Sequence, residues 1–169
     1  MRRVRFLVCD LPVALALALF LFAFFPNLAA AKDPPSDVCS LLTPQQLQKT
    51  LGQTFGAAQK TSAPPAYMGQ SAGTNCRYSD SSGRHEVVLI VYADRSPEEA
   101  KQTFEKLSAW YPAAAKPSGI GDSAYIDKSH AIHVLKGSVR YFINAGSSAP
   151  DAVQDKQAQE LAISVAAQL

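Results

Sequence analysis

The sequence predicts an α+β domain, an antiparallel sheet of about five or six strands flanked by helices, behind a secretory leader. Three observations predict it. A basic and then apolar segment opens the chain, short apolar segments joined by glycine-containing turns follow, and amphipathic segments with helical spacing separate them. Strands connected by tight turns and interrupted by few helices are typical of an antiparallel sheet with helices packed on it.

The first 31 residues have the three parts of a cleavable signal peptide. Basic residues at positions 2, 3 and 5 precede an apolar run over 11–25, and a small-residue stretch ending at Ala31 places the cleavage site before Lys32. As a helix the apolar run rises about 22 Å, less than the roughly 30 Å hydrocarbon core of a bilayer. An uncleaved anchor is therefore the second interpretation. A cleaved signal peptide, the first interpretation, predicts a periplasmic or secreted protein with no stable membrane span after signal cleavage.

Removal of the leader balances the charge of the chain. Of the 16 basic and 14 acidic residues, 13 of each remain after residue 31. Nucleic-acid binding needs clustered Lys and Arg, so no nucleic-acid partner is predicted. The remaining 138 of 169 residues are enough for one core. We expect a flexible, proline-bearing leader over 32–38 and a single α+β domain over 39–169.

Two cysteines remain in this mature part, Cys39 and Cys76. Two thiols in an oxidising compartment are expected to pair, and closing the loop between them would stabilise the fold by roughly 4 kcal/mol in the chain-entropy model. A metal pair or a redox couple would need a C-x-x-C spacing or nearby histidines, which are absent from this spacing. Cys39 also lies too far behind Ala31 to be a lipid-attachment cysteine.

The domain begins with a short predicted helix. Thr43, Pro44 and Gln46 supply an N-cap, a first-turn proline and a capping-box glutamine, and Gly52 ends the helix. A weak strand over 53–61 follows.

A surface loop and a hairpin come next. The segment 62–74 is rich in Pro, Gly, Ala and Ser and indicates a loop, while 76–79 and 86–92 are predicted strands joined by a turn at 80–83. Because the run 87–92 does not alternate with polar residues, we expect it to be buried on both faces.

A second helix and a second meander are predicted in the second half of the domain. Ser96 and Glu99 predict a helix start with a capping box, and Pro112 ends that helix. Its apolar stripe is Ala100, Phe104, Leu107 and Tyr111. Strands are predicted over 123–126, 130–135 and 139–144. A last helix starts near 148–151 and buries Ala158, Leu161, Ala162, Val165 and Leu169. The predicted order is α-β-β-β-α-β-β-β-α.

Three short motifs resemble a family of exported bacterial domains. They are Cys39-Ser-Leu-Leu-Thr43 before a helix ending in Leu-Gly52, Cys76-Arg-Tyr78, and Gly119-Ile-Gly-Asp-Ser-Ala-Tyr125. The chain is similar in these positions to LpqN-like lipoproteins, and the resemblance implies a PsbP-like sheet with flanking helices. It also implies a Cys39–Cys76 disulfide and a glycine turn, with no catalytic residue to carry over. Many relatives are lipid-anchored, whereas this chain lacks the required cysteine box.

Several residues suggest a metal, catalytic or cofactor site, but the sequence around each of them does not fit that site. His130 and His133 suggest a metal site, but residues three apart on a strand point to opposite faces. Gly121-Asp122-Ser123 is similar to the nucleophile block of some lipolytic hydrolases, yet a strand follows it and no base is evident. Gly119-x-Gly121 lacks the third glycine of a dinucleotide fingerprint. We therefore predict no catalytic residue, no metal and no cofactor.

Carboxylate pairs and aromatic residues complete the candidates. Glu98 with Glu99, or Asp94 with Glu86, could act as an acid and a base, although helix-start carboxylates are explained by capping and the helix dipole. Aromatic packing explains Tyr111 as a core residue with Trp110 capping it. The alternative is a binding groove whose rim is formed by Tyr67, Met68 and Trp110.

Three functions remain open at this point. The leading hypothesis is a non-enzymatic module of the cell envelope or the medium that binds an unknown protein or small ligand, with the loop 62–74 as the candidate binding loop. The alternatives are an extracytoplasmic hydrolase using Ser123 or a carboxylate pair, and a purely structural envelope component.

Overall fold

The computed structural model describes residues 34–65 and 72–169. The chain divides into two units, Met1–Ala30 and Ala31–Leu169. The predicted signal peptide lies outside the described residues, all of which belong to the second unit. Among the residues described, no helix combines the length and the hydropathy that a membrane span requires.

Eleven elements follow one another among the described residues of this unit. They are the 3-10 turn η1 (Val38–Leu41), α2 (Pro44–Leu51), β1 (Gln59–Ala63), β2 (Gly73–Ser79), β3 (Glu86–Ala93), α3 (Pro97–Trp110), β4 (Ala113–Ala115), β5 (Ser123–Asp127), β6 (Ile132–Lys136), β7 (Val139–Asn144) and α4 (Asp151–Ala166).

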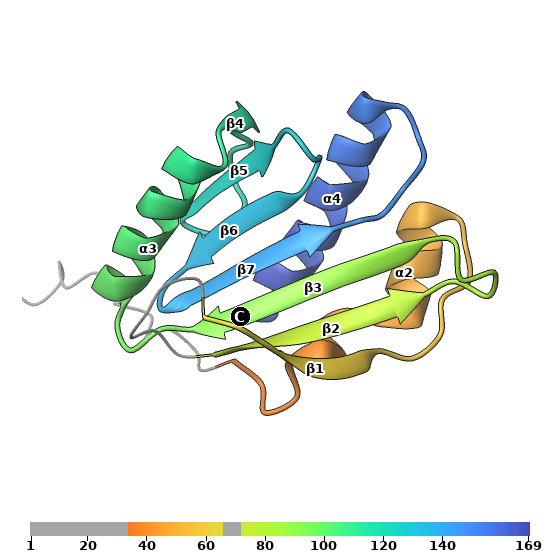
Figure 1. Ribbon diagram of the computed structural model, residues 1–169, viewed down its shortest axis with the longest axis horizontal. Helices are drawn as coiled ribbons and strands as arrows, with labels where there is room; N and C mark the ends of the chain where they lie inside the picture. The colour runs from red at the N-terminus through yellow and green to blue at the C-terminus, as the bar shows by residue number, and fades with distance from the viewer. Residues whose placement is uncertain (1–33, 66–71) are drawn as a thin grey trace, which may run out of the picture. The chain divides into compact units, whose positions relative to one another are not determined.

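The strands form one open, antiparallel sheet in the order β1-β2-β3-β7-β6-β5-β4 (Figure 1). One meander comprises β1 to β3 and the other β4 to β7, and β7 pairs with β3 to join them. The α+β class with an antiparallel sheet is thus confirmed. The sheet has seven strands rather than five or six. The unpredicted strand is β4, whose three alanines pair with β5 at one edge.

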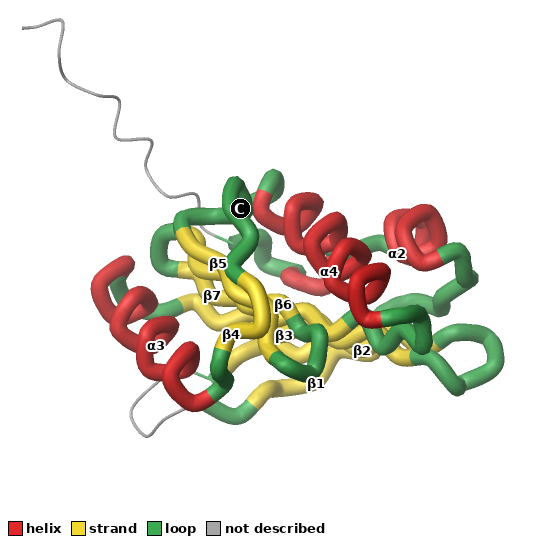
Figure 2. Tube along the Cα trace, turned by 90° about the horizontal axis from the view of Figure 1, so that it is seen from above, coloured by secondary structure: helices red, strands yellow, loops and turns green. Residues whose placement is uncertain are grey.

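The two faces of the sheet carry different helices (Figure 2). Helices α2 and α4 contact each other and cover one face, called here the helix-pair face. Its core includes Leu89, Tyr141 and Ile143 from the centre of the sheet. Helix α3 packs on the opposite face, called the α3 face, where Phe104 meets Tyr125 and other residues of β5 and β6.

Helix α3 covers only part of its face, which corrects one prediction. In β3 the buried residues alternate: Val87, Leu89 and Val91 are buried on the helix-pair face, whereas Val88 and Ile90 are half-buried on the α3 face. The expected burial of this strand on both faces is therefore wrong. In Figure 1, α3 lies beside β5 and β6, away from β1 and β2. The apolar run is continuous although only one of its faces lies under a complete helical layer.

Helix starts agree closely with the capping patterns. Thr43 accepts a hydrogen bond from the backbone N–H of Gln46, whose side chain accepts one from Thr43 in return, so the capping box of α2 is complete. In α3, Ser96 accepts from the Glu99 N–H. The Glu99 carboxylate reaches back to the N–H of Arg95 instead of Ser96. Both helices therefore begin where the sequence predicts, and α3 has half of its predicted box.

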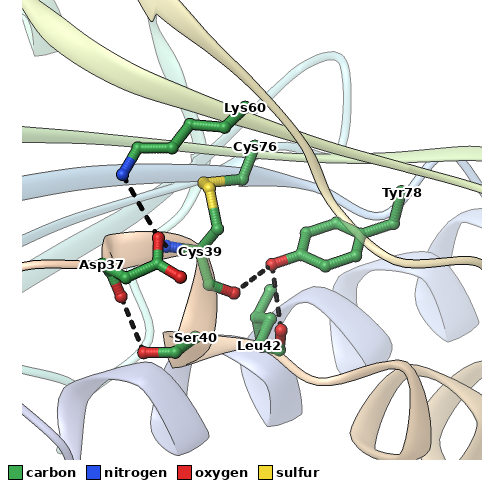
Figure 3. Close-up of a disulfide and its surroundings, with 7 residues drawn as sticks. All are labelled: Asp37, Cys39, Ser40, Leu42, Lys60, Cys76 and Tyr78. Carbon is green, nitrogen blue, oxygen red and sulfur yellow. Dashed lines mark hydrogen bonds and ion pairs between the residues drawn. A yellow bond between two sulfur atoms is a disulfide. The ribbon is translucent and has the colours of Figure 1, made fainter.

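The Cys39–Cys76 disulfide is present, with 5.5 Å between the two Cα atoms (Figure 3). It joins η1 to β2 at the helix-pair face. Beside it, the Tyr78 hydroxyl lies 2.7 Å from the carbonyl oxygen of Cys39 and 2.9 Å from that of Leu42, and donates to this pair (Figure 3). Burial raises the pKa of Tyr78 far above its usual range, so the hydroxyl keeps its proton. A covalent bond and a buried hydrogen bond thus hold the start of the domain against the sheet.

The predicted glycine turn precedes β5. Gly119 and Gly121 both have positive φ, and a Cβ at Gly121 would lie 2.4 Å from the carbonyl oxygen of Leu135. Because real Cβ atoms do not approach so closely, Gly121 is required for the backbone to pass beside β6. The motif is therefore a structural turn.

Candidate functional site

A groove of about 610 Å³ lies between α3 and the uncovered part of the α3 face. Its floor comes from β3, β6 and β7, and Pro64 and Pro65 border it opposite the helix. We call this the α3 groove. Its lining comprises Pro64, Pro65, Ile90, Tyr92, Phe104, Leu107, Trp110, Tyr111, Pro112, Asp127, Lys128, Ser129, His133, Val134, Arg140, Tyr141 and Phe142. A cavity of this size with mainly apolar walls and a few polar groups is typical of small-ligand sites.

Strand pairing explains why apolar and aromatic side chains meet on the floor. Ile90 pairs with Phe142, and Phe142 pairs with His133 on the next strand. Paired residues of neighbouring strands point to the same face, so these three side chains form a row across the sheet. Phe104 and Leu107 supply the opposite wall. Both belong to the predicted apolar stripe of α3, in which successive residues lie three or four positions apart.

His133 is held in the row by aromatic rings and by Asp127. Its ring stacks on Tyr125 with 4.4 Å between centroids, and Phe142 meets it edge-on at 5.0 Å. Nε2 lies 2.9 Å from a carboxylate oxygen of Asp127. Burial lowers the pKa of His133, since the opposing effect of Asp127 is smaller. His133 is therefore neutral at pH 7, with the proton on Nε2 facing the carboxylate and Nδ1 left as an acceptor.

Asp127 stays ionised beside this neutral imidazole. Burial acts to raise its pKa, but hydrogen bonds from Ser129 and His133 outweigh burial and hold the pKa below its ordinary value. The Ser129 hydroxyl donates to one carboxylate oxygen at 2.6 Å, and the backbone N–H groups of Ser129 and Ala131 donate to the same oxygen. The turn between β5 and β6 thus builds a fixed cradle for one negative charge.

Arg140 is the second buried ionic group of the groove. Its side chain is 4% exposed, and Nε and Nη2 donate to the two carboxylate oxygens of Asp94 at 2.5 and 3.0 Å. The guanidinium carbon lies 4.9 Å from the ring centroid of Tyr92, a cation–π contact. Within the described part of the chain, no acceptor is found for Nη1. The groove therefore offers a hydrogen-bond donor at Arg140 and an acceptor at His133.

Of the predicted rim residues, Trp110 lines the α3 groove, and 64% of its surface is exposed. Tyr67 and Met68 lie outside the described residues, as does most of the part of the candidate loop 62–74 that follows Pro65. Tyr111 is 51% exposed, so the prediction that it fills the core is wrong. The helix ends at Trp110, which places the Tyr111 ring beside His133 at 6.0 Å between centroids instead of under the helix.

The two histidines of the metal hypothesis are also separate, although not for the predicted reason. His130 precedes β6 in a turn with a φ of 61°, so it does not lie on a strand as predicted. Its ring contacts Asp155 at 2.8 Å and Asp151 at 3.4 Å, both on α4. His133 faces the α3 groove. The described residues contain no group of three or more potential ligands that could hold a metal ion.

The other chemical candidates have structural partners. Ser123 is exposed and pairs with Leu135, whereas His133 pairs with Tyr125, so the register does not place this serine opposite the imidazole. The Asp122 carboxylate accepts from the N–H of Gly137 at 2.6 Å.

The predicted carboxylate pairs do not converge either. Glu86 bonds to Arg77 and Asp94 bonds to Arg140, so this pair is divided between two arginines. Glu98 and Glu99 lie in the first turn of α3, where a hydrogen bond with the helix backbone and one with Ser96 lower the pKa of Glu98. Helix capping accounts for both glutamates.

The polar groups of the groove, Arg140 and His133, were not identified from the sequence, although the sequence contains a signal for them. Arg140 occurs within the apolar strand Val139–Asn144, and His133 within Ile132–Lys136. Arg140 lies on the same side of its strand as the aromatic Phe142, two residues away, and His133 is paired with Phe142 across the neighbouring strand. An ionisable residue inside an apolar strand needs a polar partner.

The motifs that resemble LpqN-like and PsbP-like proteins lie elsewhere, at the disulfide and the turn before β5. None of their cysteines or glycines lines the α3 groove. No family model, no curated protein and no solved structure matches the chain.

Proposed function

We propose that this protein is an exported, non-enzymatic binding module that holds a small, largely apolar ligand in the α3 groove. The observation that carries the proposal is the groove itself, an open volume of about 610 Å³ lined mainly by aromatic and aliphatic side chains. Pockets of about 300–1,000 Å³ with this lining bury most of a small ligand. The floor and the helix are regular elements, so the site exists before the ligand arrives.

Export is supported by the leader and by the disulfide. The basic and apolar N-terminal pattern is that of a signal peptide, and a structural disulfide persists in oxidising compartments. The proposed location is the periplasm or the medium. A mature N-terminus at Lys32 in protein recovered from the extracytoplasmic fraction supports this part of the proposal, and an intact N-terminus in the cytosol contradicts it.

A fluorescent apolar probe tests the groove directly. We expect 1-anilinonaphthalene-8-sulfonate to bind saturably, with its emission shifted to the blue. Replacing the rim residue Trp110→Ser removes apolar contact area with little effect on folding, because the side chain is mostly exposed. We expect this change to weaken binding by about tenfold, the loss from roughly 1.4 kcal/mol of contact.

Ile163 provides a matched control for this experiment. It is 52% exposed on α4, which covers the other face of the sheet, and it is absent from the groove lining. Ile163→Ser should leave the dissociation constant of the probe unchanged. Equal losses from Trp110→Ser and Ile163→Ser, or binding that does not saturate, would overturn the proposal.

A further inference from the structure

We propose that the ligand of the α3 groove carries an anionic oxygen head group, in its simplest form a carboxylate, and that this group binds Arg140 while the apolar part lies along α3. The inference rests on the proposed function and specifies the chemistry of its ligand. It is based on the hydrogen bonds that Arg140 makes through Nε and Nη2 and on Nη1, the guanidinium nitrogen that makes none to the described residues.

Arg140 has more donors than its partner can accept. Asp94 takes the hydrogen bonds of Nε and Nη2, and among the described residues Nη1 finds no acceptor. The side chain is 4% exposed and it lines the groove. Nη1 is not one of the fully buried side-chain atoms that lack a partner, so it is reached from the groove, where water can satisfy it in the free protein. An oxygen atom of a ligand in the groove would complete the guanidinium.

The charged side chains that line the groove are Arg140, Lys128 and Asp127, whereas Asp94, which compensates the charge of Arg140, is not part of the lining. Arg140 on β7 pairs with Leu135 on β6. The backbone of Asp127 bonds to Ala131, which lies four residues before Leu135 in the chain. At about 3.3 Å per residue, Asp127 therefore lies roughly 13 Å along the strands from the level of Arg140. Asp127 is therefore the more distant of the two carboxylates, Asp94 and Asp127, from a head group at Arg140, and its repulsion falls with that distance.

The opposite end is a poorer site for an anion. Lys128 is exposed there, but it follows Asp127, whose carboxylate is ionised and buried. The free Nδ1 of His133, between the two ends, is an acceptor and can bind a hydroxyl but not a carboxylate. Donor, charge and burial coincide at Arg140, so the head group is assigned to that residue. Charge-assisted hydrogen bonds are stronger than neutral ones, which predicts discrimination between head groups.

A series of ligands with one tail and three head groups tests this assignment without changing the protein. The probes are decanoate, decan-1-ol and decylammonium, each below the concentration at which it forms micelles. Binding is followed by displacement of the anilinonaphthalene probe. We expect decanoate to bind at least about tenfold more tightly than decan-1-ol, as a charge-assisted hydrogen bond allows, and decylammonium to bind most weakly.

Two variants then locate the head group. Asp94→Asn keeps an oxygen acceptor for Arg140 but removes the compensating charge, so the preference for decanoate over decan-1-ol should increase. The ratio of two affinities in one variant is insensitive to a general loss of stability. Lys128→Gln, at the other end of the groove, should leave the ratio unchanged.

The outcomes separate the two proposals. If none of the three amphiphiles displaces the probe, the proposed function fails along with this inference. If all three bind equally, or decylammonium binds best, the groove remains a binding site and the anionic head group is wrong. If Lys128→Gln abolishes the preference or Asp94→Asn lowers it, the assignment to Arg140 is wrong.

Discussion

Buried polar groups are treated differently on the two faces of the sheet. On the helix-pair face, the hydroxyl of Tyr78 donates to the carbonyl oxygens of Cys39 and Leu42, and that of Tyr141 donates to Ala162 at 2.8 Å. On the α3 face, Nη1 of Arg140 and Nδ1 of His133 have no partner within the part of the chain described. The two tyrosine hydroxyls in the core of the helix-pair face are satisfied within that core, whereas these two nitrogens of the α3 groove keep capacity for a ligand.

The largest test of this comparison removes the covalent bond at the helix-pair face. The double variant Cys39→Ser, Cys76→Ser opens a loop with a sequence separation of 37. We expect it to lower the free energy of unfolding by about 4 kcal/mol, measured by urea denaturation, because the unfolded chain regains the entropy of that loop.

The groove gives this prediction its control. Since the disulfide lies on the opposite face, the folded double variant should bind the anilinonaphthalene probe with unchanged affinity in the absence of urea. A large loss of affinity in protein that is still folded would show that the two faces are not independent. A loss of unfolding free energy below about 1 kcal/mol would contradict the role assigned to the disulfide.

Three Tyr→Phe variants compare the faces more finely. Tyr78→Phe leaves two buried carbonyl groups without a donor and should cost about 2 kcal/mol of unfolding free energy. Tyr141→Phe should cost about 1 kcal/mol, because its acceptor is a single carbonyl at Ala162. Tyr92→Phe on the α3 face loses an exposed hydrogen bond to Pro64 and should cost less than about 0.5 kcal/mol. Urea denaturation of the three variants measures the order, and an equal cost at Tyr92 and Tyr78 would remove the distinction between the faces.

Local signals were sufficient for the helices and for most strands. The capping residues Thr43 and Ser96 begin α2 and α3, and the predicted stripe of α4 is buried. Strand β4 could not be predicted, because three alanines have neither alternation nor strand preference and pair with β5 through tertiary contacts. The incomplete cover over β3 could not be predicted either, since the apolar run does not show how far α3 extends across the sheet.

The site was less accessible to sequence reasoning than the fold. Trp110 was identified as a rim candidate, and it lines the groove. The pairs that define the polar chemistry were not identified, because Arg140 and Asp94 are 46 residues apart and meet only through the register of β3 with β7. His130 was assigned to a strand, whereas the hydrogen bonds of Asp127 wind the chain into a turn at that point.

The smallest expected effect is a difference in pKa between two histidines, one bonded to α4 on the helix-pair face and the other in the α3 groove. His130 bonds to Asp155 of α4, and this hydrogen bond raises its pKa above the ordinary value near 6.5. Its contribution to stability is therefore complete below pH 6.5 and is lost as the pH rises through the folded-state pKa. Burial in the α3 groove lowers the pKa of His133, so its contribution is present above pH 6.5 and is lost as the pH falls through the lower, folded-state pKa.

Proton NMR titration of the two imidazole rings measures both directions in one sample. We expect the His130 midpoint above 6.5 and the His133 midpoint below it, with Asp155→Asn returning the first toward the ordinary value and leaving the second unchanged. Because a carboxylate near His133 would favour its charged form, bound decanoate should raise the His133 midpoint relative to bound decan-1-ol. A His133 midpoint above that of His130 in the free protein would mean that the groove is filled with water and that its imidazole is not desolvated. The α3 face would then differ from the helix-pair face only in its exposure to solvent. The reason for expecting an apolar ligand in the α3 groove would disappear.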